Sequence, residues 1–88
     1  MSQRPVLASV MHERLQQDEK WGVQNHSDLA WLAVLAEEFG EAAQVVVESS
    51  VPPDARPSPN LERELVQVAA VAIAWIECIR RRKEADRE

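Results

Sequence analysis

A chain of 88 residues is long enough for one small domain, and its net charge of −5 argues against a nucleic-acid backbone as its partner. Hydrophobic residues make up 45% of the chain, more than a solitary three-helix unit of this size can bury, so we expect it to assemble with copies of itself into a dimer or tetramer. The single cysteine, Cys78, excludes an internal disulfide and is typical of the reducing cytoplasm, where we expect the protein to act.

The first predicted helix covers about residues 6–20. Pro5 suits a first helical turn. Apolar residues then recur at helical spacing, at Val6, Leu7, Val10, Met11 and Leu15. Lys20 complements the helix dipole near the end, and Gly22 suits the residue that follows a helix in the left-handed conformation. The first 12 residues lack the apolar core of a signal peptide, so we expect none.

The second predicted helix runs from about residue 28 to 48. Ser27 is a good N-cap for it, and Asp28 suits its first turn. Four prolines follow within eight positions and exclude a helix there. We expect a mobile linker at about 49–59 inside a single domain that spans residues 1–88, since neither half has enough core to fold alone.

The third predicted helix runs from about residue 60 to 83, with Ser58 and Pro59 as its N-cap and first residue. Its apolar run is interrupted and shorter than the roughly 20 residues that cross a bilayer, so we expect no membrane partner. Four consecutive positive charges at residues 80–83 either complement the helix dipole or contact a phosphate. The predicted fold is therefore all-α, with antiparallel second and third helices, assembled into an oligomeric helical bundle.

Acidic residues form a narrow stripe on the second predicted helix. At about 100° per residue, Glu37, Glu38 and Glu41 cover an arc of roughly 100°, and nearly all of the remaining circumference is apolar or small. On the third helix, Glu64 falls on the apolar side, with Gln67 at its edge. Residues Glu62, Arg63, Glu77 and Arg81 fall on the other side, where we expect solvent.

A carboxylate on an apolar face costs several kcal/mol unless it is paired, protonated or bound to a metal. Hard oxygen ligands select Mg²⁺ or Mn²⁺, and Glu38, Glu41 and Glu64 are the best candidates. Glu37 either ligates the ion or orients a water molecule. The alternative is a solvated stripe on the second helix and a Glu64 that serves only as a first-turn acid.

The pattern Glu37-Glu38-x-x-Glu41, followed by Glu64-x-x-Gln67, resembles the EExxE…ExxD signature of the MazG-like all-α nucleoside triphosphate pyrophosphohydrolases. Residues 20–26 and 31–33 are also similar to short members of that superfamily, so the resemblance covers roughly residues 11–80. It implies Mg²⁺-dependent hydrolysis of a nucleoside triphosphate to the monophosphate and pyrophosphate, with the four glutamates as catalytic residues. Gln67 departs from the pattern, because the family has Asp there. The amide oxygen of Gln67 can ligate a metal but brings no charge.

A nucleoside end of the site is expected near the first loop. Trp21 offers a flat face for a base, Asn25 an amide for base edges, and Lys20 a charge for a phosphate, with His26 beside them. Three of these residues also have a simpler interpretation: Trp21 as a packing residue, His26 as a surface histidine and Lys20 as an exposed lysine.

Two other functions remain open at this point. A MazG-like fold that has lost catalysis would bind a nucleotide as a sensor, which the amide at Gln67 suggests. A helical interaction module without a ligand is suggested by the wide apolar faces.

Overall fold

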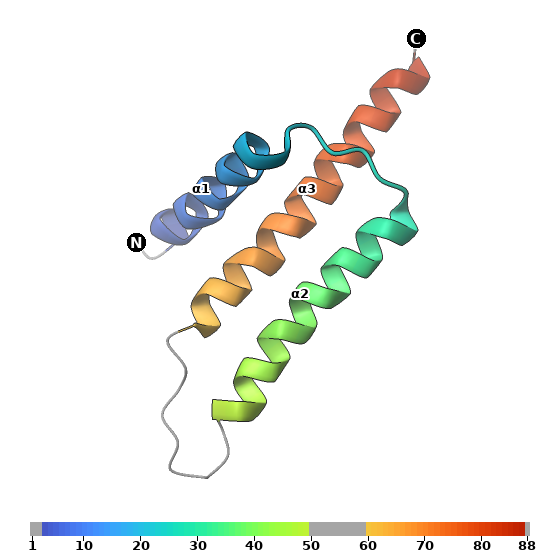
Figure 1. The fold of residues 1–88 in the computed structure, drawn as a ribbon. Coiled ribbons are helices and arrows are strands. Elements are labelled where there is room, and N and C mark those ends of the chain that lie inside the picture. Colours follow the sequence, from blue (N-terminus) through green and yellow to red (C-terminus); the bar gives the residue numbers. More distant parts are fainter. Residues whose placement is uncertain (1–2, 50–59, 88) are drawn as a thin grey trace.

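The computed structural model describes residues 3–49 and 60–87, and the regular structure within them is entirely helical. The helices are α1 (Gln3–Trp21), α2 (Asp28–Ser49) and α3 (Leu61–Arg87) (Figure 1). The prediction of an all-α chain with three helices is confirmed for these residues. The predicted linker at about 49–59, apart from Ser49, and the proposed N-cap at Ser58 and Pro59 lie outside the described residues.

Local chemistry accounts for the turn between α1 and α2. Gly22 has a φ of 71°, the left-handed conformation that favours glycine, and its amide donates to the Asp18 carbonyl at 2.8 Å. Ser27 caps α2: its Oγ accepts from the Ala30 amide at 3.2 Å, and its carbonyl accepts from the Trp31 amide at 3.0 Å. Both predictions from the sequence are therefore confirmed.

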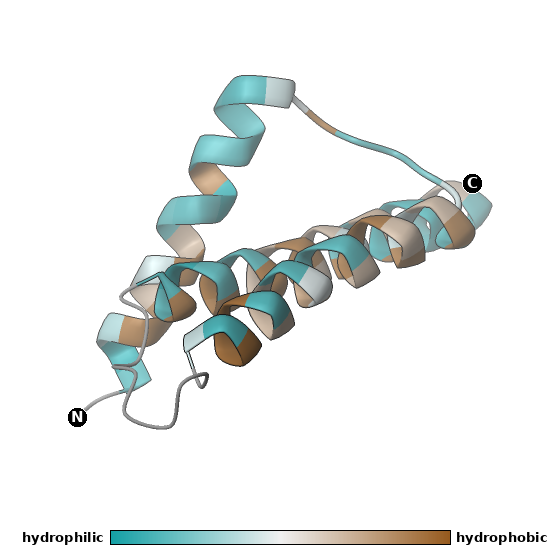
Figure 2. Cartoon of the chain, turned by 60° about the horizontal axis from the view of Figure 1, so that its bottom comes forward, coloured by the Kyte–Doolittle hydropathy of each residue, from teal (hydrophilic) through white to brown (hydrophobic). Residues whose placement is uncertain are grey.

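The central helix is α3, which packs against α1 on one side and α2 on the other (Figure 1). No Cα atom of α1 comes within 8 Å of one of α2, and Figure 2 shows α1 rising away from the α2–α3 pair. The core consists of Trp31 from α2 with Val71, Ala74 and Cys78 from α3. Cys78 is 3% exposed and packs in this core as a free thiol.

An ion pair joins α1 to α3. Arg14 is 9% exposed, and its Nε donates to Glu77 Oε1 at 2.9 Å. The same guanidinium donates to Gln17 Oε1 at 3.0 Å and to Asp18 Oδ1 at 2.9 Å. The expectation that Glu77 faces solvent is met in part: its side chain is 45% exposed, and its charge is also balanced by Arg14 of α1.

Arginines of α3 hold the loop between α1 and α2. Arg81 donates from Nε to Asn25 Oδ1 at 3.0 Å and from Nη2 to the Gln24 carbonyl at 2.9 Å. Arg82 donates to Asp28 Oδ1 at 3.1 Å and to the His26 carbonyl at 3.2 Å. Arg81, which we expected to face solvent, is half-buried because these bonds hold it against the loop. Since α3 continues to Arg87, these charges do not lie at the helix end, and they bind the loop instead of the dipole.

No helix in the described part of the chain combines the length and the apolar character needed to span a bilayer.

Candidate functional site

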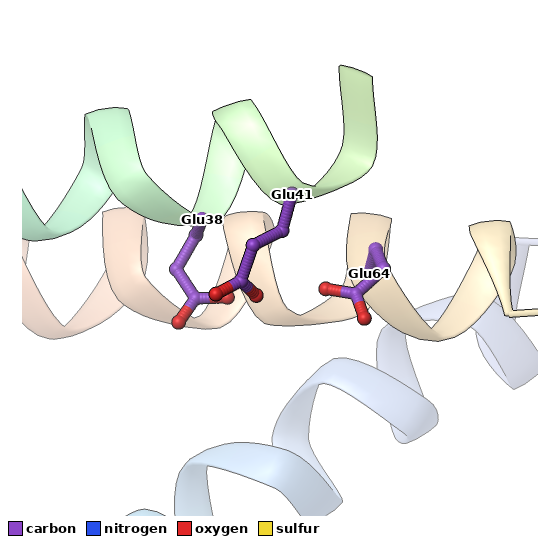
Figure 3. Close-up of side chains that lie close together, drawn as sticks. All are labelled: Glu38, Glu41 and Glu64. Carbon is purple, nitrogen blue, oxygen red and sulfur yellow. The ribbon is translucent and has the colours of Figure 1, made fainter. Parts of the chain in front are cut away.

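Three carboxylates from two helices converge on one side of the α2–α3 pair. Glu38, Glu41 and Glu64 each offer an oxygen, and these oxygens all lie within 4.8 Å of one another. Figure 3 shows Glu38 and Glu41 extending from α2 towards α3, where Glu64 meets them. The structure therefore brings together the three residues that the sequence indicates as metal ligands.

Helix geometry explains why these residues meet. Glu38 and Glu41 are three positions apart, so they project from one side of α2. The neighbouring Ala42 is 4% exposed, which holds this stretch of α2 close to α3. Glu64 belongs to the first turn of α3 and is half-buried, as Glu38 is, whereas Glu41 is exposed.

The cluster disfavours its own full ionisation. Desolvation, followed by the charges of Glu41 and Glu64, raises the pKa of Glu38 above its ordinary value. Desolvation and the neighbouring Glu64 carboxylate raise the pKa of Glu41 in the same direction. A divalent cation between these oxygens would remove the repulsion, and hard carboxylate oxygens are the ligands that Mg²⁺ and Mn²⁺ prefer. The donor set therefore fits the cation that the sequence predicts.

Two further acids surround the cluster. Glu37 is not one of the three convergent residues, but its negative charge contributes to the raised pKa of Glu38 and of Glu41. Glu13 of α1, which the sequence analysis missed, also acts on Glu38. Glu13 lies three residues after the buried Val10, on the same side of α1.

A cavity of about 230 Å³ adjoins the cluster and shares Glu38 with it. Its walls come from all three helices and the first loop: Gln17, Trp21, Gln24, His26, Trp31, Val34, Glu38, Gln67, Val71 and Ala74. The volume is below the roughly 300–1,000 Å³ of typical ligand pockets. It therefore suits one end of a ligand whose remainder extends towards the carboxylates.

The residues expected at the nucleoside end are only partly brought together. Trp21 and His26 line this cavity with Gln67. Lys20 places its Nζ 4.8 Å from the centre of the Trp21 ring, and Trp21 remains 54% exposed. Asn25 does not line this cavity but a second one of about 630 Å³, which His26 and Arg81 also line, and Arg81 donates to its Oδ1.

The His26 ring contacts the core at Trp31. Its centre lies 4.9 Å from that of Trp31, at an interplanar angle of 69°, an edge-to-face contact. Trp31 is 2% exposed and therefore fixed in position. His26 is itself exposed, as its interpretation as a surface histidine implies, and this contact places its ring at one wall of the cavity.

No protein-family model matches this sequence, and neither the curated proteins nor the solved structures gave a significant match.

Proposed function

We propose that this chain is a MazG-like nucleoside triphosphate pyrophosphohydrolase that depends on Mg²⁺ or Mn²⁺. The observation that supports the proposal is the convergence of Glu38, Glu41 and Glu64 within 4.8 Å, next to a cavity lined by an exposed tryptophan. The resemblance of the sequence to the MazG-like motif, which involves the same glutamates, is the second line of support.

The three convergent carboxylates would hold the cation. When bound, such an ion neutralises phosphate charge and lowers the pKa of a coordinated water molecule. In the proposed reaction, water attacks the α-phosphorus and the bond to the oxygen that bridges the α- and β-phosphates breaks. The products are a nucleoside monophosphate and pyrophosphate. Glu37, beside the cluster, accepts a hydrogen bond from the attacking water and orients it.

The cavity would take the nucleoside. Trp21 stacks on the base, since an exposed indole face tolerates any base. Gln67 and His26 contact its edge or the sugar, and Lys20, already beside Trp21, reaches a phosphate. Asn25 takes part only if it exchanges its bond to Arg81 for one to the ligand.

A second candidate function follows from Gln67. It lines the cavity as an uncharged amide where the family pattern has a carboxylate, so the cation site has one negative charge fewer. A protein with this site would bind a nucleotide through a weakly held ion and release no pyrophosphate. The biological role would then be sensing rather than housekeeping of the cytoplasmic nucleotide pool.

We also propose that α2 and α3 form the antiparallel core of an oligomeric bundle, a dimer or tetramer. Many large apolar side chains are exposed in the single chain, among them Leu7, Met11 and Leu15 on α1, Leu29 and Phe39 on α2, and Leu65 and Ile76 on α3. Exposed apolar surface on this scale is typical of an interaction face.

A substrate screen separates the two candidate functions. The common, deoxy and oxidised nucleoside triphosphates are incubated with the protein in Mg²⁺, in Mn²⁺ and in a chelator, and pyrophosphate is measured. The pyrophosphohydrolase releases it only with a divalent cation, and Glu41→Gln abolishes the release. Nucleotide binding without pyrophosphate release supports the sensor. If the protein neither binds a nucleotide nor releases pyrophosphate, both candidate functions are refuted and the interaction module remains.

A further inference from the structure

Gln17 of α1 is a polar side chain at a buried position. It is 9% exposed, yet it lines the cavity of about 230 Å³ that adjoins the carboxylate cluster. The amide of a glutamine has an oxygen that accepts hydrogen bonds and an NH2 group that donates them, and burying either without a partner costs free energy. The partners of Gln17 therefore indicate what this wall of the cavity can bind.

Arg14 fixes which way the Gln17 amide faces. Gln17 Oε1 accepts from Arg14 Nη1 at 3.0 Å. A guanidinium group only donates, so the oxygen of the amide, and not its nitrogen, must face Arg14. Arg14 is itself 9% exposed, and it donates to Glu77 and to Asp18, each at 2.9 Å. The Gln17 NH2 group is therefore held on the side of the amide that faces away from Arg14.

The NH2 group of Gln17 has no partner of its own. Gln17 Nε2 donates to no residue in the ranges 3–49 and 60–87. In that part of the chain, the side-chain atom that is both fully buried and unpartnered is Trp31 Nε1, so Gln17 Nε2 is not fully buried. Gln17 lines the 230 Å³ cavity, whereas Arg14 lines a smaller one of about 80 Å³ instead. The free donor of Gln17 therefore faces the 230 Å³ cavity.

Pairing with Arg14 does not by itself account for a glutamine at this position. Arg14 needs only an acceptor, and a carboxylate at residue 17 would form a stronger, charge-assisted bond to the guanidinium. Glutamine instead combines the acceptor with a donor that Arg14 cannot use. That donor is the part of the side chain for which packing between the described residues provides no use.

We propose that Gln17 selects the base of the nucleotide: its Nε2 donates a hydrogen bond to an acceptor on the base edge, a carbonyl oxygen or an unprotonated ring nitrogen. The inference rests on the nucleoside binding proposed above for this cavity. Trp21 stacks on the face that every base offers, so it does not select. A base with an N–H at that edge sets donor against donor and binds more weakly. Because Arg14 already holds the amide, binding costs little side-chain entropy.

Binding of nucleotide analogues tests the proposal without turnover. α,β-Methylene analogues of the common nucleoside triphosphates lack the bridging oxygen at which the proposed reaction cleaves, and ribose 5-triphosphate lacks the base. Dissociation constants are measured in Mg²⁺ by calorimetry for wild type and three variants. Gln17→Met keeps the length of the side chain and removes the donor. Gln17→Glu keeps an acceptor for Arg14, so it stays folded even if Gln17→Met does not. Gln16→Met, at the exposed neighbour, is the control.

The loss of affinity should depend on the base. For the analogue that wild type binds most tightly, Gln17→Met should raise the Kd about 2- to 10-fold, the effect of one lost neutral hydrogen bond. Gln17→Glu should raise it further, because its second carboxylate oxygen repels the acceptor of the base. Ribose 5-triphosphate should bind wild type and Gln17→Met equally, and it measures the general effect of the added charge in Gln17→Glu. Gln16→Met should match wild type with every ligand.

The results distinguish base selection from the proposed reaction. An equal loss with and without the base would show that Gln17 only supports the fold, and it would overturn the proposal. Unchanged affinity of both Gln17 variants for every analogue would overturn it too. If affinity depends on Gln17 and the base but natural triphosphates give no pyrophosphate, base selection stands and the pyrophosphohydrolase is refuted. If wild type binds no analogue, base selection and nucleoside binding in this cavity are refuted together.

Discussion

The carboxylates of Glu38 on α2 and Glu64 on α3 lie within 4.8 Å of each other, together with that of Glu41. Carboxylates this close repel one another, and desolvation of Glu38 adds to the effect. The folded chain therefore holds negative charge at a position that a divalent cation would stabilise.

The first prediction concerns pH in the absence of metal. Because the pKa of Glu38 and Glu41 is raised by folding, the folded state holds these protons more tightly than the unfolded state does. Their contribution to the free energy of unfolding is therefore largest at acid pH. It decreases as the pH rises from about 4.5, the ordinary value, through the raised pKa.

The measurement is the difference in free energy of unfolding between Glu38→Gln and wild type in a chelator, followed between about pH 4 and pH 8. The free energy of unfolding of the variant should increase relative to that of wild type as the pH rises, because the variant lacks the repelling charge. A difference that stays flat would show that Glu38 is freely solvated.

The second prediction concerns Gln67, which lines the cavity next to Glu38. Gln67→Asp adds a fourth carboxylate, and we expect Mg²⁺ affinity to increase by about tenfold or more, because the added charge acts at short range. Gln67→Asn, which shortens the side chain without adding charge, is the control. Equal Mg²⁺ affinity in the Asp and Asn variants would place residue 67 outside the cation site.

The third prediction concerns the ion pair between α1 and α3. Arg14→Met leaves Glu77 without its partner and should lower the free energy of unfolding by about 1–3 kcal/mol. This range is below that of a fully buried pair because the Glu77 side chain is 45% exposed. Arg87→Met, which removes an exposed contact to Glu84 at 3.9 Å, should change it by less than about 0.5 kcal/mol. Urea denaturation measures both variants, and equal effects would contradict the role given to Arg14.

The fourth prediction concerns Trp21. Stacking of a base on an aromatic ring is worth about 1–3 kcal/mol, so Trp21→Ala should raise the KM for the triphosphate about 5- to 150-fold. Trp21→Phe should recover most of that loss. Stabilisation by Mg²⁺ alone should be the same in both variants, since Trp21 is not one of the convergent carboxylates. An unchanged KM would contradict binding of the nucleoside in this cavity.

Periodicity was sufficient to predict the helices and the carboxylate cluster. The side chain of Ser27 and the conformational freedom of Gly22 fixed two helix ends, and the i, i+3 spacing of Glu38 and Glu41 placed both on the side of α2 where Glu64 lies. The ends of a helix and the side on which a residue lies are local properties, and the sequence of that helix is enough to predict them.

Periodicity could not show which neighbour each side meets. Glu77 and Arg81 have the pattern of solvated residues, yet each is only half-exposed, because Arg14 of α1 contacts Glu77 and Asn25 of the first loop contacts Arg81. Glu13 was missed for the same reason: its role depends on how α1 is placed over α3. Asn25 is adjacent in sequence to His26, but the two side chains contact different helices. Asn25 contacts Arg81 of α3, whereas His26 contacts Trp31 of α2.

The most direct test of the cation site is the change in melting temperature caused by Mg²⁺ in wild type, Glu64→Gln and Glu62→Gln. Glu62 shares the first turn of α3 with Glu64 but is exposed and lies outside the cluster. An ion that binds only the folded form stabilises it in proportion to its occupancy. We expect a rise with Mg²⁺ in wild type and Glu62→Gln, no rise in Glu64→Gln, and a metal-free Glu64→Gln protein at least as stable as wild type. If Glu64→Gln instead melts earlier without metal and keeps its response to Mg²⁺, Glu64 is a structural acid of the helix start and the proposed site is wrong.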